Sequence, residues 1–503
     1  NSVLSSCDIK ATDASDINPF DFGAMRFDAI IGNPPYLTTE GMKNFTPKEL
    51  PLYKQKYTSA YKQFDKYIVF VERAMDLLKD NGLLGYIVPL KFMKVGAGQE
   101  LRRLILTQKT LEAITAFGAC KVFPGKSNYT CLLIVKKTEH ETFRYNEVSN
   151  LNQWKLADKN ILPVDTKSYD EISESTWALF PEHLRGAYDT ILSNSTTLLA
   201  ITGEDNIFNG IQTSANKVYV FQPKSERNGI YTFEKDGQDW KVEKEVTRAY
   251  FQTSTGDDGL NTYRTFKPNA CVIFPYRKND KDKLEMIPLD DIMHDYPKLY
   301  KYLLAHENIL NAASRDIKPV PTTASEWHRY GRHQSLDACN LPKKIIVGDK
   351  YAVDSFSTFV SSGGTAGYCM IALPEDSPYS IYYLQAILNC KYLEWISSLY
   401  GEIFGGGFIA RGTKVLKQLP IRKIDFENND ERLAHDSIGD LQKQLIQMGD
   451  EIDAAHGNKR KLTILQRQFE LSKQQLADFI MHLYGMEPYD SIIPLIKEQY
   501  AAD

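Results

Sequence analysis

Apolar and polar residues alternate in two distinct ways along the first 140 residues. Short aliphatic runs, which we expect to be strands, occupy 27–32, 83–89, 111–117 and 129–137. Between them, 66–79 and 97–106 carry apolar residues three and four positions apart, the spacing of one helix face. Strands that alternate with helices of about 10 to 15 residues predict parallel α/β winding.

A different pattern begins near residue 150. Short aromatic-rich runs at 217–221, 271–276 and 343–348 are separated by long polar connections. Helical spacing recurs only sparsely, at 296–306 and 381–400. This pattern predicts a separate α+β domain over residues 151–424.

The last segment, residues 425–503, has a helical pattern throughout. Apolar residues three or four apart run through 441–452 and again through 462–483, with a polar break at 454–460 and one polar interruption at Ser472. We expect an antiparallel helical hairpin that serves packing or oligomer formation.

The 503 residues are 43% apolar and 25% charged, as in a globular protein of about two to four domains. No apolar stretch approaches the ~20 residues that cross a bilayer, and the start has no secretory signal. Seven scattered cysteines without a C-x-x-C pair indicate reduced thiols, so we expect a cytoplasmic protein without a membrane partner. The chain does not begin with Met, and we expect it to start inside a longer protein.

The net charge is −4, and the acidic surplus is concentrated in residues 425–503. Local patches matter more than totals for phosphate contact, so charge neither supports nor excludes a nucleic-acid partner. The nine histidines form no H-x3-H or H-E-x-x-H pattern, and we expect no metal site.

The strand at 27–32 runs directly into Asn33-Pro34-Pro35-Tyr36. Two prolines remove two backbone donors, so the Pro34 carbonyl and the Asn33 side-chain oxygen can converge on one NH2 group. Tyr36 offers a ring face for a flat heterocycle, with its polar tip toward solvent. These groups suit the amino group of an adenine extruded from a duplex. Holding both amino protons makes that nitrogen nucleophilic toward an electrophilic methyl group. A simple strand-ending turn is the alternative for the same four residues.

The run "FDAIIGNPPY" resembles the catalytic motif of S-adenosylmethionine-dependent adenine-N6 DNA methyltransferases, and residues 64–106 look like the helix–strand–helix that follows it in the gamma class. Residues 121–137 are similar to a later loop and strand in which an aromatic residue closes the adenine pocket. This resemblance implies Phe123 as a second wall opposite Tyr36; an ordinary core aromatic is the alternative.

The same resemblance implies a site for S-adenosylmethionine as cofactor. The stretch "VLSSCDI" (3–9) fits the strand whose terminal acid holds the cofactor's adenine, which implies Asp8 as that acceptor, Ile9 beside the ring, and Asn33 bordering the methyl group. Asp8 capping a turn is the alternative. The family's Gly-rich cofactor loop does not occur here, so we expect only the second half of a class I (Rossmann-like) methyltransferase sheet over residues 1–150. A preceding segment or a separate polypeptide would then pair with the exposed edge.

Residues 207–221, 327–349 and 383–424 resemble, more loosely, the target-recognition domains of type IIG restriction–modification methyltransferases. The resemblance implies double-stranded DNA as a partner. Planar and cationic groups suited to stacking, base contact or phosphate contact gather in two clusters: Trp327, Arg329, Tyr330 and Arg332, then Arg411, Lys414 and Lys417. Solvated loops are the alternative for both clusters. An endonuclease domain or subunit, if present, would lie elsewhere.

Together these features predict a site-specific DNA adenine-N6 methyltransferase of a restriction–modification or phage-defence system that acts by base flipping. Two other functions stay open. One is a catalytically incomplete DNA-recognition or assembly subunit, and the other is a protein glutamine methyltransferase, which also uses Asn-Pro-Pro-Tyr.

Overall fold

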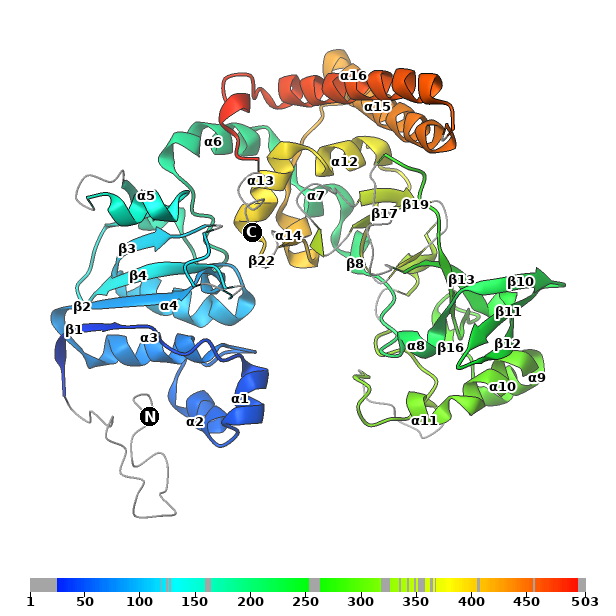
Figure 1. Cartoon of the computed structure of the whole chain (residues 1–503), viewed down its shortest axis with the longest axis horizontal. Helices are drawn as coiled ribbons and strands as arrows, with labels where there is room; N and C mark the ends of the chain where they lie inside the picture. The colour runs from blue at the N-terminus through cyan, green and yellow to red at the C-terminus, as the bar shows by residue number, and fades with distance from the viewer. Residues whose placement is uncertain are drawn as a thin grey trace. The chain divides into compact units, whose positions relative to one another are not determined.

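The computed structural model of the chain is shown in Figure 1. The structure describes residues 25–118, 120–123, 125, 128–158, 164–252, 263–317, 326–333, 336–341, 343–347, 350–351, 358–361, 365–366, 368–404, 408–455 and 457–495. The predicted strand at 3–9, with Asp8 and Ile9, lies outside these residues.

The chain forms two compact units. The first contains residues 1–189, 395–410 and 491–503, and the second contains residues 190–394 and 411–490. Their boundaries fall within α6 (Arg185–Ser193) and α13 (Lys391–Tyr400). Within the residues described, no helix has both the length and the apolar composition needed to cross a membrane.

The first unit is built on a six-stranded sheet with the order β1-β2-β4-β3-β5-β6. Its strands are β1 (Phe27–Gly32), β2 (Leu78–Pro89), β3 (Leu111–Ala116), β4 (Thr130–Lys136), β5 (Thr142–Glu147) and β6 (Asp165–Ser168). Its remaining helices are α1 (Thr39–Phe45), α2 (Glu49–Lys56), α3 (Lys66–Leu77), α4 (Gln99–Gln108) and α5 (Leu151–Leu156). This mixed α/β architecture confirms the fold class predicted for the N-terminal part.

Strand direction differs in one respect from the predicted parallel winding. β1 is parallel to β2 and β3 is parallel to β5, but β4 is antiparallel to both β2 and β3. The described residues of the connection from β3 to β4 form no helix, and without a crossover helix a strand returns in the opposite direction. Consequently β1, β2, β3 and β5 all end at the same edge of the sheet.

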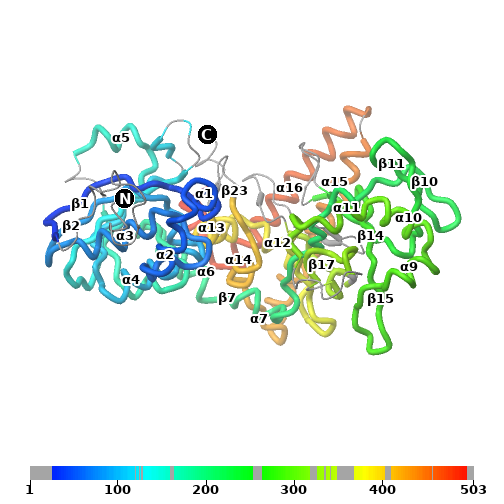
Figure 2. Tube along the Cα trace, turned by 90° about the horizontal axis from the view of Figure 1, so that it is seen from below, coloured from blue at the N-terminus to red at the C-terminus, as the bar shows by residue number. Residues whose placement is uncertain are grey.

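Helix α3 supplies much of the core on its side of the sheet. Eight of its twelve residues are buried, among them Ile68, Val71 and Met75, because its apolar positions recur every three or four residues. It runs beside β1 and β2 in both views of the chain (Figures 1 and 2). The buried face fixes where β1 ends and the turn at Asn33 begins.

β1 is an edge strand among the described residues, since it pairs only with β2. Ile31 is 87% exposed although residues 29–31 of the strand form an apolar run like that of a buried parallel strand. The sequence of β1 is thus adapted to burial that the described residues do not supply.

The first unit extends beyond the boundary predicted at residue 150. β6 adds a strand to the sheet, and the following segment through Asp189 belongs to the same unit. Tyr169 ties this segment to β3, because its hydroxyl accepts a hydrogen bond from the Leu111 amide at 2.7 Å. The separation of residues 151–424 from 425–503 stays a prediction, since most of both stretches lies in the second unit.

The second unit combines small sheets with helices, as an α+β domain does. Its strands are β7 (Ser195–Thr197), β8 (Ile207–Asn209), β9 (Val220–Phe221), β10 (Pro223–Arg227), β11 (Ile230–Lys235), β12 (Gln238–Glu243), β13 (Thr247–Phe251), β14 (Ala270–Ile273), β15 (Tyr276–Lys278), β16 (Leu284–Met286), β17 (Lys344–Val347), β18 (Lys350–Tyr351), β19 (Thr358–Ser361), β20 (Thr365–Ala366), β21 (Cys369–Ala372) and β24 (Pro420–Arg422). β22 (Ile403–Phe404) and β23 (Phe408–Ala410) fall in the first unit.

The remaining helices of the second unit are α7 (Leu198–Thr202), α8 (Asn216–Tyr219), α9 (Leu289–Asp295), α10 (Pro297–Ala305), α11 (Glu307–Leu310), α12 (Ile381–Leu388), α14 (Thr413–Gln418), α15 (Asn429–Ala454) and α16 (Lys459–Tyr484). The predicted hairpin is confirmed as α15 and α16. The strand predicted at 217–221 is mostly helix α8, followed by the two residues of β9.

Candidate active site at the carboxyl ends of the parallel strands

Asn33 and the two prolines form the turn that follows β1. Asn33 is exposed, Pro34 is buried and Pro35 is exposed. The buried Pro34 ring fixes the turn to the core, and its restricted φ holds the neighbouring amide group in place. The Asn33 side chain therefore faces solvent from a rigid support.

Tyr36 is held in place by the neighbouring strand. Its hydroxyl donates a hydrogen bond to the main-chain oxygen of Ile87 in β2, at 2.9 Å. Its ring packs edge-on against Tyr67, with centroids 6.1 Å apart. Burial raises the pKa of Tyr36 to about 12, with a smaller contribution from Cys131, so the phenol stays protonated. The hydroxyl thus faces β2 rather than solvent, which corrects our expectation of a solvent-facing tip.

The segment after the turn is anchored to the start of α3. The Lys66 amide donates to the main-chain oxygen of Leu37 at 2.7 Å, and the Thr39 hydroxyl donates to that of Phe64, also at 2.7 Å. Thr38 caps α1 by accepting a hydrogen bond from the Gly41 amide. These hydrogen bonds fix the segment that follows the turn to the start of α3 and limit the movement of the turn.

An ion pair that the sequence did not predict lies beside this anchor. Asp65, the residue before α3, is 6% exposed and contacts Lys91 with an N–O distance of 2.6 Å. Burial raises the pKa of Asp65, and the charge of Lys91 opposes that shift. Lys91 follows β2 directly, so the pair joins the start of α3 to the carboxyl end of β2. The sequence feature that could have indicated this ion pair is Asp65, an acidic residue directly before the apolar helix α3.

Phe123 lies in the connection between β3 and β4 and is half-buried. Because β1 and β3 share a direction, this connection begins at the same sheet edge as Asn33 and Tyr36. Its role as the second wall of a base pocket stays a prediction. The cofactor residues Asp8 and Ile9 lie outside the described residues.

The first predicted DNA-contact cluster is mostly internal. Trp327 is 6% exposed and Tyr330 is fully buried, with its hydroxyl donating to the main-chain oxygen of Ile273. Arg329 is 6% exposed and pairs with Glu326 at 2.7 Å. These three side chains pack within the second unit. The Tyr330 hydroxyl and the Arg329 guanidinium both have hydrogen-bonding or ionic partners there. We therefore propose no DNA contact for them.

Arg332 is partly exposed but already engaged. Its guanidinium contacts the Asp316 carboxylate at 2.5 Å and donates to the main-chain oxygen of the same residue at 2.8 Å. A phosphate would have to compete with that carboxylate. Arg332 thus serves first to fix the loop in which it lies.

The second predicted cluster divides between the interior and the surface. Arg411 is fully buried and donates to the main-chain oxygen of Leu388 at 3.1 Å, so it is no surface cation. Lys417 is partly exposed and paired with Glu204. Lys414 is exposed on the first turn of α14. Only Lys414 and Lys417 remain candidates for phosphate contact.

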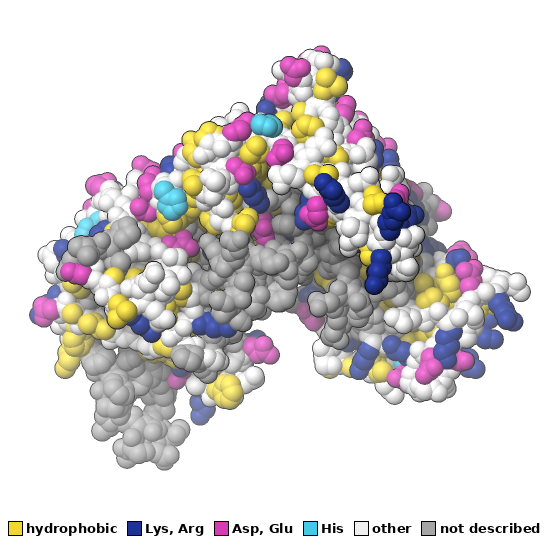
Figure 3. Space-filling model, turned by 45° about the horizontal axis from the view of Figure 1, so that its top comes forward, with side chains coloured by type: hydrophobic (Ala, Val, Ile, Leu, Met, Phe, Trp, Pro, Cys, Tyr) yellow, Lys and Arg dark blue, Asp and Glu magenta, His cyan; other side chains and the backbone are white. Residues whose placement is uncertain are grey.

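Charge elsewhere on the described surface is mixed. On the face in Figure 3, Lys and Arg side chains are interspersed with Asp and Glu. Among the residues described, no group of three or more His, Cys, Asp or Glu side chains could hold a metal ion.

Comparison with known proteins identifies the first segment of the chain. Residues 5–123 match the family model of the Eco57I restriction-modification methylases. The chain is 43% identical over 507 aligned residues to the type II restriction enzyme and methyltransferase RM.Eco57I of Escherichia coli. That match covers 99% of this chain and 50% of the relative, so the chain spans half of that protein's length.

Two further matches extend the comparison. The type II methyltransferase M.PaeR7I of Pseudomonas aeruginosa is 37% identical, over 79% of this chain and 64% of its own length. Among solved structures, the type IIL restriction-modification enzyme MmeI in complex with DNA aligns with a TM-score of 0.54 and 11% identity. This alignment covers 94% of this chain and 57% of MmeI, and it shows a shared fold. The chain is thus similar to the Eco57I restriction-modification methylases over residues 5–123, and to RM.Eco57I along nearly all of its own length.

Proposed function

We propose that this chain forms the DNA-recognising and methyl-transferring part of a restriction–modification protein, and that it methylates adenine at N6. One observation carries the proposal: an exposed Asn33 is fixed by a buried Pro34 and followed by a clamped Tyr36, at the carboxyl ends of parallel strands. Ligands of α/β sheets bind at this edge. The family match over residues 5–123 supports the same assignment.

The turn would act by accepting both protons of an adenine amino group. The Asn33 side-chain oxygen and the Pro34 carbonyl would each accept a hydrogen bond from one amino proton, because neither proline offers a competing donor. The proton acceptors are fixed before the substrate arrives, so stabilisation of the developing positive charge requires no rearrangement. The amino nitrogen becomes the nucleophile without a separate base.

Two rings would enclose the adenine. Tyr36 offers a ring held by its bond to Ile87, and Phe123 would close the opposite side. A base in this pocket must leave the duplex, since one proton of a paired adenine's amino group is already hydrogen-bonded to thymine. We therefore propose base flipping as part of the reaction.

S-adenosylmethionine is the proposed cofactor, and when bound it supplies the electrophilic methyl group. The described residues fit one wall of such a site, because Asn33 is exposed beside the open edge of β1. Asp8 would accept from the cofactor's adenine amino group, and Ile9 would pack near its ring. Asn33 would border the transferred methyl group.

A preceding segment or a separate polypeptide would complete the sheet. The Gly-rich cofactor loop, which does not occur in this sequence, would come from that segment or polypeptide. Measuring S-adenosylmethionine binding to residues 1–503 alone tests it. Tight binding by this chain without any partner would contradict it.

The other partners are proposed on the basis of the proposed DNA methylation. Double-stranded DNA is the proposed substrate, and the cytoplasm is the proposed location. Lys414 and Lys417 are the proposed phosphate contacts. An endonuclease domain or subunit is proposed outside this chain, because RM.Eco57I is named as both restriction enzyme and methyltransferase. The relatives do not favour an assembly subunit or a glutamine methyltransferase.

Asn33→Ala tests the proposal in the full-length protein. The change should lower methyl transfer to adenine by at least about 100-fold, as loss of one pre-organised polar group does in other enzymes. Duplex affinity should stay within about twofold of wild type because Asn33 is exposed and carries no charge. Asn44→Ala, an exposed Asn in α1, is the matched control and should keep full activity. Retained turnover in Asn33→Ala would overturn the assignment of the pocket.

A further inference from the structure

The first unit contains a cavity of about 310 Å³. It lies where β3 and β5 end, next to the 3-10 helix Leu90–Met93, and is closed by residues 177–184, 395–399 and Pro494. Asn33 and Tyr36 are not among its lining residues. Its volume is within the range of small-molecule sites, about 300 to 1,000 Å³.

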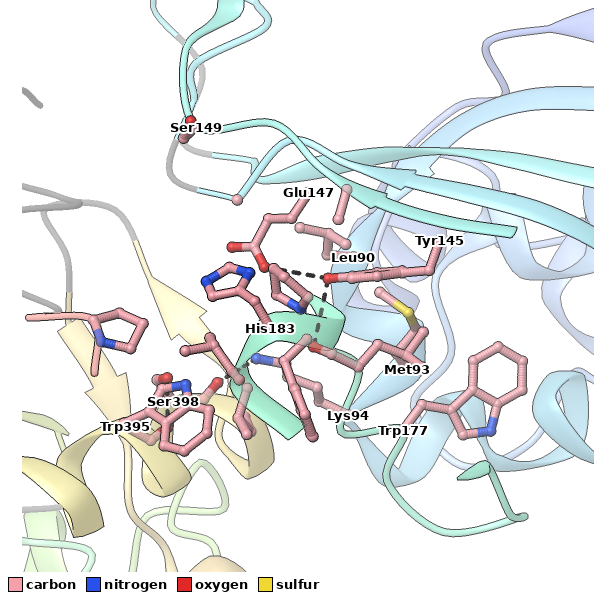
Figure 4. Close-up of a pocket in the computed structure, with 18 residues that line it drawn as sticks. Leu90, Met93, Lys94, Tyr145, Glu147, Ser149, Trp177, His183, Trp395 and Ser398 are labelled. Carbon is pink, nitrogen blue, oxygen red and sulfur yellow. Dashed lines mark hydrogen bonds between the residues drawn. The ribbon is translucent and has the colours of Figure 1, made fainter. Parts of the chain in front are cut away.

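Two oppositely charged side chains line this cavity. Lys94 donates a hydrogen bond from Nζ to the main-chain oxygen of Ser398, at 2.5 Å. The Glu147 carboxylate accepts a hydrogen bond from the Tyr145 hydroxyl at 3.3 Å. Figure 4 shows both groups at the cavity, with Glu147 beside Tyr145 and Lys94 next to Ser398.

Both charged groups keep unused bonding capacity. An ammonium has three protons, and in the described part of the chain Lys94 uses one of them; a carboxylate can accept about four hydrogen bonds, and Glu147 accepts one. The two side chains form no ion pair with each other within the residues described, although each affects the other's pKa. A ligand that offers donors to Glu147 and an acceptor to Lys94 would use this capacity.

The surroundings shift the pKa of both groups toward the uncharged form. Burial raises the pKa of Glu147, and Lys94 only partly offsets that effect. Burial likewise lowers the pKa of Lys94 to about 8. Perturbed groups that face one cavity are more frequent at functional sites than elsewhere. Glu147 is nonetheless solvent-accessible, so a ligand can reach it.

The walls of the cavity are aromatic and apolar. Trp177, Phe180 and Trp395 are each at most 3% exposed, and Trp395 packs edge-on against Phe180 with centroids 5.8 Å apart. Rigid rings of this kind favour a flat, aromatic ligand over a flexible chain. The ligand is therefore expected to be a planar heterocycle with polar groups along one edge.

We propose that the cavity binds a guanine base, with Glu147 facing the N1 and N2 protons and Lys94 facing the O6 oxygen. Guanine carries two adjacent donors next to a carbonyl oxygen, which matches a carboxylate beside an ammonium. Adenine would place an unprotonated ring nitrogen against the carboxylate. Inosine lacks the N2 amino group and would lose one of the two bonds to Glu147. The base can come from a free guanine nucleoside or nucleotide, or from an unpaired guanine in DNA.

Isothermal titration of the full-length protein with guanosine, inosine, adenosine and cytidine tests the proposal. Guanosine should bind, and inosine should bind about 10-fold more weakly, the cost of one hydrogen bond to a charged group. Adenosine should bind at least as weakly as inosine. Glu147→Gln should lower guanosine affinity by at least 10-fold, whereas Glu139→Gln, at an exposed carboxylate, should leave it unchanged.

Competition distinguishes the two sources of the base. An oligonucleotide duplex with one unpaired guanine should displace guanosine if DNA is the source, compared with the same duplex carrying an unpaired adenine. Lack of displacement assigns the site to free nucleosides or nucleotides. Asn33→Ala should bind guanosine as wild type does, so a failure of the methyl-transfer assignment would leave this result unaffected. Equal binding of guanosine and adenosine, or an unchanged affinity in a folded Glu147→Gln, would overturn the proposal.

Discussion

The phenolic hydroxyl of Tyr36 donates a hydrogen bond to the main-chain oxygen of Ile87, 2.9 Å away. Ile87 lies in β2, so this bond joins the turn after β1 to the adjacent parallel strand. The Tyr36 ring is consequently oriented by the protein itself. A flat substrate would stack on a ring that is already oriented, which reduces the entropy lost on binding.

The two parts of Tyr36 are expected to contribute differently to activity. Tyr36→Phe keeps the ring and loses one hydrogen bond worth about 1 kcal/mol, so methyl transfer should fall by no more than about 5-fold. Tyr36→Ala also loses stacking worth about 1–3 kcal/mol per base, and the rate should fall by about 5- to 150-fold further. Transfer of labelled methyl groups to duplex DNA measures both. Equal losses in the two variants would show that the ring is not the functional part.

Lys414 and Lys417 are expected to differ in their effect on DNA affinity. Lys414 is exposed, whereas Lys417 is only partly exposed and contacts the Glu204 carboxylate. Lys414→Ala should weaken duplex binding and reduce the slope of log affinity against log salt by about one. Lys417→Ala should change the slope by less. Duplex titrations at several salt concentrations measure this, with Lys459→Ala at the start of α16 as the control.

Arg411 should contribute to stability rather than to DNA binding. Its guanidinium is fully buried and donates to the main-chain oxygen of Leu388. Arg411→Ala removes a large buried side chain and leaves that oxygen unsatisfied, so it should destabilise the second unit by about 2–4 kcal/mol. Lys414→Ala, three residues later and exposed, should change stability by less than about 0.5 kcal/mol. Urea denaturation compares the two, and a folded Arg411→Ala with reduced DNA affinity would contradict this assignment.

Glu147 should lower stability at neutral pH. Its pKa is raised in the folded state, chiefly by burial, so the folded protein binds the proton more tightly than the unfolded chain does. Stability therefore falls as pH rises from the unfolded value of about 4.5 through the raised folded pKa. Glu147→Gln should remove this fall and melt at a higher temperature than wild type at pH 8.

Thermal melts at pH 4 and pH 8 check the prediction for Glu147. The difference between wild type and Glu147→Gln should be small at pH 4, where the carboxyl is protonated in both states. Glu139→Gln should show no such pH-dependent difference. A lower melting temperature for Glu147→Gln at pH 8 would mean that the ionised carboxylate stabilises the fold.

The first unit was the more predictable part of the fold. The runs at 27–32, 111–117 and 129–137 correspond to β1, β3 and β4 within one residue, because continuous apolar sequence demands burial in a strand. The direction of the strands was harder to predict from the sequence. β4 is antiparallel to its neighbours, and the described residues before it form no crossover helix. The helix at 217–219 was missed because the short apolar run there suits either conformation.

The candidate site was predictable only where local sequence defines it. Asn33, Pro34 and Tyr36 stand out because their chemistry depends on their being adjacent. The burial of Tyr330 and Arg411 could not be predicted from the sequence. The local sequence around a cation or an aromatic ring in a polar loop is similar whether the side chain is exposed or buried. Lys94 and Glu147 line the same cavity because β2 and β5 end at the same edge of the sheet, which depends on the order and direction of the strands.

The hydrogen bond between Lys94 and Ser398 has a consequence for folding of the nascent chain during translation. The acceptor is translated 304 residues after the donor, and at about 5–20 residues per second this takes on the order of 15 to 60 s. During that interval the ribosome carries residues 1–189 of the first unit before residues 395–410, some of which line the cavity beside Lys94, have been made. Slow codons or truncations before residue 395 should therefore lower yield by trapping this intermediate.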